Sequence, residues 1–209
     1  MSSKHSSILA LLLLIPAPSI GVISGMILLP DQILGKILFF CAKAWLLLLP
    51  LVWRRFVDRA PMSLSKPAQG GFGVAGILGL AISVFIVLAY FSLGKRLIDP
   101  QAIKDMASQT GLNNPLTYLV GSIYWITLNS VLEEYVWRWF VVDKFSQLMA
   151  PKQAIVASAL GFTLHHVVAL QIFLSVPLCA LCALGIFIGG ATWSWCYMRY
   201  RSIWPGYLS

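Results

Sequence analysis

The sequence is short of charge. Only 11% of its 209 residues are charged and 59% are hydrophobic, whereas an average soluble domain has about 25% charged residues. So few charged side chains cannot cover the surface of a water-soluble globule of this size, and the mean hydropathy of +0.83 agrees. The composition therefore excludes an ordinary soluble fold and predicts an all-α integral membrane protein.

Familiar catalytic patterns are also missing. The sequence contains no H-E-x-x-H, the helical zinc motif of soluble metalloproteases, and no G-x-S-x-G, the turn that presents a serine nucleophile. Its four cysteines all lie in apolar stretches, where cysteine usually behaves as a small hydrophobe. Cys179 and Cys182 form a C-x-x-C without a second pair or a redox-type context. Any chemistry must therefore come from other residues.

Long apolar runs are abundant. A spanning helix needs about 20 mostly apolar residues. The uncharged stretch 153–198 is roughly twice as long as the ~30 Å hydrocarbon core requires, so it must fold back once, near Gln171–Pro177. We expect a polytopic bundle of about six transmembrane helices in a single membrane domain, residues 1–209. The other expected spans are Ile8–Leu29, Ile33–Val52, Phe72–Leu93 and Leu116–Val142.

The net charge of +8 indicates how the chain is oriented in the membrane. The basic residues lie mainly between apolar stretches, as in cytoplasmic loops, and form no run suited to nucleic acid. We therefore expect a multi-pass protein of the plasma membrane or an internal membrane, in contact with lipid, with a cytoplasmic N-terminus and no nucleic-acid partner. Nine basic residues then fall on the cytoplasmic side: Lys4, Arg54, Arg55, Arg59, Lys66, Lys144, Lys152, Arg199 and Arg201. Four fall on the other, and Lys43 and Arg138 lie inside spans; the four are Lys36, Lys95, Arg96 and Lys104.

Two adjacent acids interrupt an apolar run. Glu133 and Glu134 lie inside the expected helix Leu116–Val142, where an ionised carboxylate costs at least about 2.5–3.5 kcal/mol. Glu134 and Arg138 are four residues apart, so we expect an ion pair along one helix face. Glu133 points about 100° away and has no cation within a turn. It is therefore the better candidate for a general base that activates a water molecule.

Two adjacent histidines follow in the next expected helix. Phe162 and His166 share a face, and His165 points about 100° away. Counting along both helices places Glu133 and His166 near the middle of the membrane. A lone histidine in an apolar helix is more often a packing residue, but the pair favours one histidine beside the acid. Imidazole is a good zinc ligand and a carboxylate can be a ligand or a base, so the acid and the histidines could also hold a Zn²⁺ ion.

The two motifs resemble those of a known family. Glu133–Arg138 matches E-E-x-x-x-R and Phe162–His166 matches F-x-x-x-H, in order and on successive apolar helices. They are similar to the first two signatures of the CAAX-protease and bacteriocin-processing family of intramembrane peptidases, which includes the Ras-converting enzyme and the lysostaphin resistance protein A-like proteins. The resemblance covers residues 116–209. It implies an endopeptidase that cleaves a prenylated or otherwise membrane-associated, hydrophobic peptide.

The resemblance also assigns roles. Glu133 would activate the hydrolytic water, and His166 would assist it or bind metal. The supporting residues, which shape the site or position His166, would be Glu134, Arg138, Phe162 and His165. Whether zinc or a glutamate–histidine pair carries the chemistry stays open.

The family's third signature, H-x-x-x-N or H-x-x-x-D, commonly follows a Ser-Leu/Ile-Trp-like segment. Ser202–Ser209 looks like that lead-in, with the histidine due at the next position. The resemblance therefore implies either a fragment of a longer protein or a natural truncation that lacks the third motif.

The same residues fit two other functions. The acid and histidine cluster could only hold helices together, in a non-catalytic membrane protein such as an immunity factor or scaffold. It could also relay protons in a transporter, although transporters usually show more spans and internal repeats.

Overall fold

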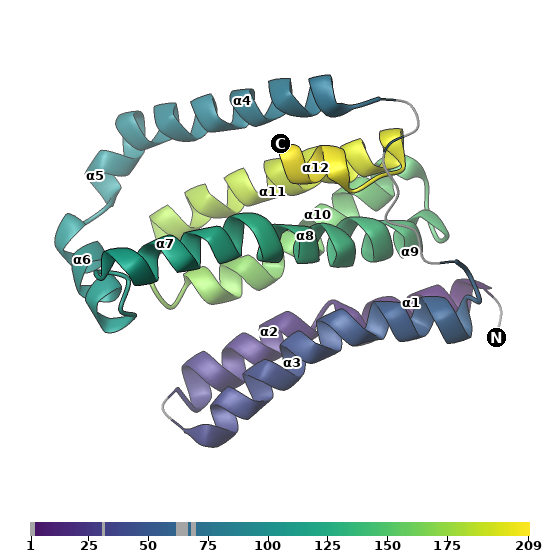
Figure 1. Cartoon of the computed structure of the whole chain (residues 1–209), viewed down its shortest axis with the longest axis horizontal. Helices are drawn as coiled ribbons and strands as arrows, with labels where there is room; N and C mark the ends of the chain where they lie inside the picture. Colours follow the sequence, from purple (N-terminus) through teal and green to yellow (C-terminus); the bar gives the residue numbers. More distant parts are fainter. Residues whose placement is uncertain (1–2, 31, 62–66, 68–69) are drawn as a thin grey trace.

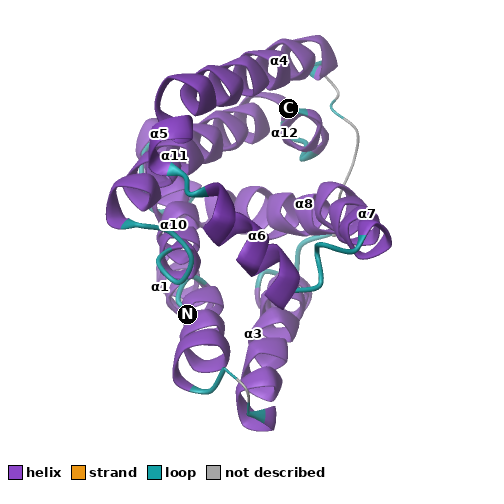
Figure 2. Ribbon diagram, turned by 90° about the vertical axis from the view of Figure 1, so that its left-hand side faces the viewer, coloured by secondary structure: helices purple, strands orange, loops and turns teal. Residues whose placement is uncertain are grey.

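The computed structural model describes residues 3–30, 32–61, 67 and 70–209, and within these ranges the chain contains helices and no strands (Figures 1 and 2). The N-terminal helices form a hairpin that lies beside the rest of the bundle (Figure 1). Its elements are α1 (Ser3–Leu14), α2 (Ala17–Val22) and the π-helical η1 (Ile23–Leu28), then α3 (Ile33–Val52) and the π-helical η2 (Trp53–Val57).

The remaining elements follow a long connection. First come α4 (Phe72–Ala89), η3 (Tyr90–Gly94), α5 (Lys95–Leu97) and α6 (Pro100–Gln109). One continuous helical run follows, residues 115–146, built from α7 (Pro115–Tyr124), η4 (Trp125–Asn129), α8 (Ser130–Glu133), η5 (Glu134–Val142) and α9 (Asp143–Ser146). The chain then forms α10 (Pro151–Leu170), α11 (Val176–Tyr200) and α12 (Trp204–Leu208).

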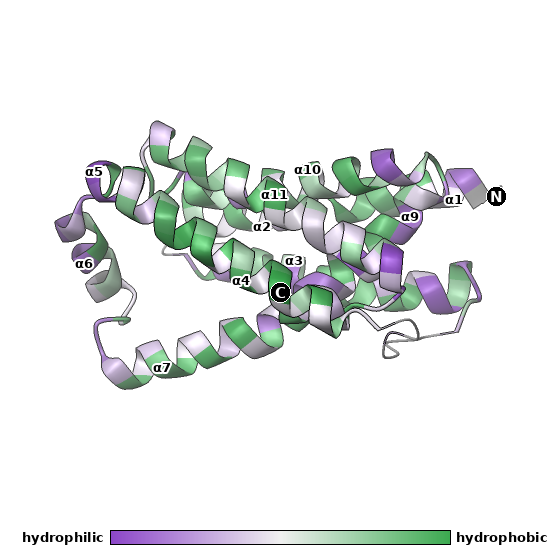
Figure 3. Ribbon diagram, turned by 90° about the horizontal axis from the view of Figure 1, so that it is seen from above, coloured by the Kyte–Doolittle hydropathy of each residue, from purple (hydrophilic) through white to green (hydrophobic). Residues whose placement is uncertain are grey.

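Among the described residues, five helices are long and apolar enough to cross a membrane, which confirms a polytopic helical membrane protein. Their large apolar side chains point outward: Val176 is 82% exposed and Ile33 is 77% exposed. Hydrophobic residues cover most of the bundle, whereas α6 is largely hydrophilic (Figure 3). So extensive an apolar surface needs lipid rather than water around it. The five spans are Lys4–Leu28, Ile33–Val57, Phe72–Leu97, Pro151–Leu170 and Val176–Tyr200.

Two predictions about the spans have different outcomes. The fold-back within 153–198 is confirmed, because α10 ends at Leu170 and α11 begins at Val176 and packs along it. The sixth expected span, Leu116–Val142, is helical but is not among the five membrane-length apolar helices. The reason is its polar content, since Glu133 and other charged residues interrupt the run.

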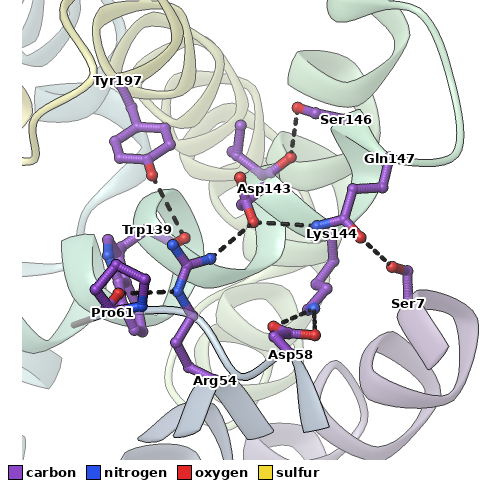
Figure 4. Close-up of polar contacts among 11 residues, drawn as sticks. Ser7, Arg54, Asp58, Pro61, Trp139, Asp143, Lys144, Ser146, Gln147 and Tyr197 are labelled. Atoms are coloured by element: carbon purple, nitrogen blue, oxygen red, sulfur yellow. Dashed lines mark hydrogen bonds and ion pairs between the residues drawn. The ribbon is translucent and has the colours of Figure 1, made fainter. Parts of the chain in front are cut away.

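The run 115–146 lies parallel to α3 and η2. Three polar contacts between them show this, because the residue numbers rise together along both segments, which therefore run in the same direction. Figure 4 shows the two ion pairs at the α9 end. The contacts are the Tyr135 hydroxyl donating to the Leu47 carbonyl oxygen at 3.0 Å, Arg54 Nη1 to Asp143 Oδ2 at 3.3 Å, and Lys144 Nζ to Asp58 Oδ2 at 2.6 Å.

The buried core is centred on η5. All nine residues of this π-helical segment are buried, among them Trp137 and Phe140, and they pack against Phe162 of α10 and Tyr197 of α11. The short helix α12 packs on both α11 and α4 (Figure 1). The motif-bearing helices therefore meet at the centre of the bundle rather than at its periphery.

Candidate active site

Glu133, His165 and His166 line one cavity of about 380 Å³. Glu133 is the last residue of α8, and the two histidines lie near the end of α10. The structure therefore brings together the carboxylate and the imidazoles that the two sequence motifs identified separately. Both histidines reach the cavity, although the helical spacing separates their directions.

The opposite wall of the cavity comes from the N-terminal hairpin. Pro18, Gly21 and Val22 of α2 contribute to it, together with Lys43 and neighbouring residues of α3. None of these residues belongs to the two motifs. Sequence reasoning missed this wall because nothing local marks a contact between segments about 100 residues apart.

Close packing of α2 and η1 on α3 builds that wall. A Cβ atom added to Gly21 would lie 2.7 Å from the Ala42 Cβ. One added to Gly25 would lie 2.9 Å from the Phe39 Cβ. Small residues four apart let helix backbones approach in this way. Gly21 and Gly25 are therefore required for the hairpin that closes the cavity.

The Glu133 carboxylate is held by its own helix. The Asn129 side-chain amide donates a hydrogen bond to Glu133 Oε1 at 2.8 Å, and Asn129 also lines the cavity. This contact restricts the carboxylate to one orientation. The signal that could have found Asn129 is a second polar residue, four positions before the acid, in an apolar helix.

His166 has a defined tautomer when neutral. Its Nδ1 lies 2.8 Å from the Phe162 carbonyl oxygen. A carbonyl oxygen only accepts, so Nδ1 carries the proton and Nε2 keeps its lone pair. His166 can thus accept a hydrogen bond at Nε2 from a water molecule or a substrate group.

His165 is packed by aromatic rings. Its imidazole stacks on the Trp137 indole with centroids 5.1 Å apart and planes within 3°. The two histidine rings are 4.0 Å apart. The His166 ring therefore contacts the His165 ring and also the Phe162 ring, whose centroid lies 4.4 Å from its own.

Glu134 and Arg138 face away from the cavity. The expected ion pair is present, with Arg138 Nε 3.1 Å from Glu134 Oε1 and both side chains buried. The guanidinium carbon lies 4.5 Å from the Phe162 ring centre and 5.2 Å from that of Trp193. Within the described part of the chain, neither Arg138 Nη atom has a hydrogen-bond partner. The guanidinium therefore rests on ring faces, and the pair fixes helix packing.

The helix α12 lies against the same ion pair. A Cβ atom added to Gly206 would clash with the Glu134 carboxylate. Only a glycine fits there without movement of Glu134 or of α12. Glu134 therefore determines how closely α12 approaches η5.

The residues do not form a complete metal site. Over the ranges that the structure describes, no group of three or more His, Cys, Asp and Glu side chains is placed to hold a metal ion. Catalytic zinc sites use three protein ligands, so Glu133 and His166 alone fall short of that set. Their role as zinc ligands stays a prediction.

The bundle and its cavity define a polytopic helical membrane protein with an internal glutamate–histidine site. Residues 115–209 match the family described as Type II CAAX prenyl endopeptidase Rce1-like. This match covers the same part of the chain as the predicted resemblance and agrees with it. The chain matches no curated protein and no solved structure. The matched region contains Glu133 and His166, whereas the α2 and α3 wall lies outside it.

Proposed function

We propose that this protein is an intramembrane endopeptidase of the CAAX-processing type in which Glu133 and His166 activate the hydrolytic water. The observation that carries the proposal is that both side chains line one cavity in an Rce1-like helical bundle. A carboxylate and a neutral imidazole at the same cavity are the groups that water activation needs.

The reaction follows from the roles of these groups. Glu133 takes a proton from water as the hydroxide oxygen attacks the carbonyl carbon of the scissile peptide bond. The C–N bond then breaks, and the protonated Glu133 returns its proton to the leaving amine. Asn129 holds the carboxylate in place, and His166 Nε2 accepts a hydrogen bond from the attacking water or the substrate. The products are a new carboxyl terminus and a released peptide.

The proposed substrate is a lipid-modified or hydrophobic peptide. The cavity lies among apolar helices whose outer surfaces need lipid, so a membrane-associated peptide can approach without leaving the bilayer. A prenyl group would provide such an anchor.

The proposed orientation places the N-terminus in the cytoplasm. This choice rests on the inside-positive bias of the basic residues. The parallel course of α3 and the run 115–146 supports the alternation of six crossings, in which these two helices run the same way for either orientation. Lys66, counted on the cytoplasmic side, lies outside the described residues.

The test is cleavage of a farnesylated synthetic peptide by the full chain in lipid vesicles. We expect release of the C-terminal fragment, detected by mass spectrometry, and its loss in Glu133→Gln and His166→Ala. Asp105→Asn, an exposed acid on α6, is the matched control and should cleave normally. Cleavage that persists in both cavity variants would overturn the assigned roles.

The non-catalytic alternative makes a different prediction. If Glu133 only holds helices together, Glu133→Gln should lower the thermal unfolding temperature in detergent substantially. If Glu133 is catalytic, the variant should be as stable as the wild type or more stable, because replacing an active-site charge often stabilises the folded protein.

A further inference from the structure

Lys43 is a second charged residue at the cavity, contributed by the opposite wall. It lies within the membrane-length helix Ile33–Val57, roughly three turns from Ile33 and about four from Val57. Its side chain lines the cavity together with Glu133 and the two histidines. A charged lysine at that depth is costly to insert into a membrane, so its position requires an explanation.

The register of the helices places Lys43 level with the reacting groups. The Tyr135 hydroxyl contacts the Leu47 carbonyl oxygen, and the two helices run in parallel. Lys43 lies four residues, or about one turn, before Leu47. It therefore faces the turn of the neighbouring helix that precedes Tyr135, where Asn129 and Glu133 lie.

The ammonium group of Lys43 has no anionic partner in the described ranges. The ion pairs found in the described part of the chain are formed by other basic residues, namely Arg54, Arg138 and Lys144. The ammonium instead lies 5.3 Å from the Phe39 ring centre. The Glu133 carboxylate, the acid of the same cavity, has Oε1 bonded to Asn129. Lys43 is an exposed residue that lines the cavity, so its ammonium is available to an anion that enters the cavity.

We propose that Lys43 binds the C-terminal carboxylate of the peptide substrate in this cavity. The inference rests on the proposed endopeptidase function and deepens it, because it makes a free C-terminus part of what the site recognises. A lipid phosphate is the other available anion. Headgroups lie at the membrane surfaces, however, about three turns or more from Lys43 along α3. A peptide that enters the cavity brings its carboxylate to the right depth.

The test measures binding separately from cleavage. A fluorescent farnesylated peptide with a free carboxyl terminus is compared with its C-terminal carboxamide, using the full chain in detergent without phospholipid. The wild type should bind the acid about tenfold more tightly, as expected for a charge-assisted hydrogen bond. Lys43→Met should bring the two affinities together, and Lys43→Arg should keep most of the preference. Lys36→Met, a lysine of the same helix that does not line the cavity, is the matched control and should behave as the wild type.

Several outcomes would overturn the proposal. Equal binding of acid and carboxamide by the wild type would do so, as would a preference that survives Lys43→Met. A preference that disappears when anionic phospholipid is added would show that Lys43 binds a headgroup instead of the peptide.

Cleavage assays then separate this proposal from the proposed function. A preference for the acid that depends on Lys43, without cleavage of either peptide, supports the carboxylate site and refutes the endopeptidase. Cleavage that depends on Glu133 but treats both peptides alike supports the endopeptidase and refutes the carboxylate site.

Discussion

The guanidinium carbon of Arg138 lies 4.5 Å from the centre of the Phe162 ring, and the same ring lies 4.4 Å from that of His166. Phe162 therefore contacts both the E-E-x-x-x-R helix and the second residue of its own F-x-x-x-H motif. It is 3% exposed, so any change in its volume must shift one of its neighbours. The acid-bearing and histidine-bearing helices are thus held in a fixed register by a cation–π contact at the centre of the bundle.

Truncation of Phe162 tests this contact. Phe162→Ala should destabilise the protein by about 3–5 kcal/mol, because it leaves a cavity and exposes one face of Arg138. It should also lower cleavage beyond the loss of folded protein, since His166 loses its packing. Leu164→Ala, on the lipid-facing side of α10 at 57% exposure, is the control and should change both quantities little. Thermal unfolding in detergent and the rate per folded molecule measure the two effects.

The two adjacent acids should respond differently to neutralisation. Glu134→Gln leaves the buried Arg138 guanidinium without its countercharge, and breaking a buried pair in this way costs about 3–5 kcal/mol. Glu133→Gln should cost little, because Glu133 lines a cavity rather than pairing with Arg138. Chemical or thermal unfolding of both variants checks this order. A larger loss for Glu133→Gln would contradict the assignment of the two faces.

The approach of α12 depends on Gly206. Gly206→Ala should destabilise by about 1–3 kcal/mol, as overpacking usually does, because the new methyl group meets the Glu134 carboxylate. Gly185→Ala in α11 is the matched control. A Cβ there meets nothing within 4 Å, and alanine is the better helix former. If both variants unfold at the same temperature, α12 does not rest on Glu134.

Asn129 should act as a positioning residue. Asn129→Ala removes the hydrogen bond to Glu133, which is worth about 0.5–1.5 kcal/mol or up to about tenfold in rate. We expect a lower kcat with an unchanged KM, since Asn129 orients the base. Thr127→Ala, which removes a hydrogen bond to the Ile123 carbonyl oxygen outside the cavity, should leave both constants unchanged. An effect of Asn129→Ala on KM alone would argue for substrate binding instead.

The sequence predicts those features of the structure that depend on the spacing of nearby residues. The different directions of Glu133 and Glu134 follow from helix geometry, and the fold-back before Val176 follows from the length of an uncharged run. The π-helical geometry of η5 has no such signal, because π-helices are rare and occur mostly as short insertions within α-helices.

Contacts between segments that are distant in the sequence could not be predicted either. Lys43 could be recognised as an unusual residue in an apolar helix, but nothing in the sequence specifies that it faces the cavity. Gly21 and Gly25 have the spacing of a helix-packing motif, yet which helix they pack against depends on the tertiary fold. The N-terminal wall of the site could therefore be found only from the structure.

The central claim is that Glu133 activates water at this cavity. The most direct measurement compares kcat/KM for cleavage of a farnesylated peptide by the wild type and by Glu133→Gln, both as the full chain in lipid vesicles. We predict a fall of about 10²–10⁴-fold, the size of a general-base contribution, with no loss of thermal stability. Cleavage by Glu133→Gln at the wild-type rate would contradict the account.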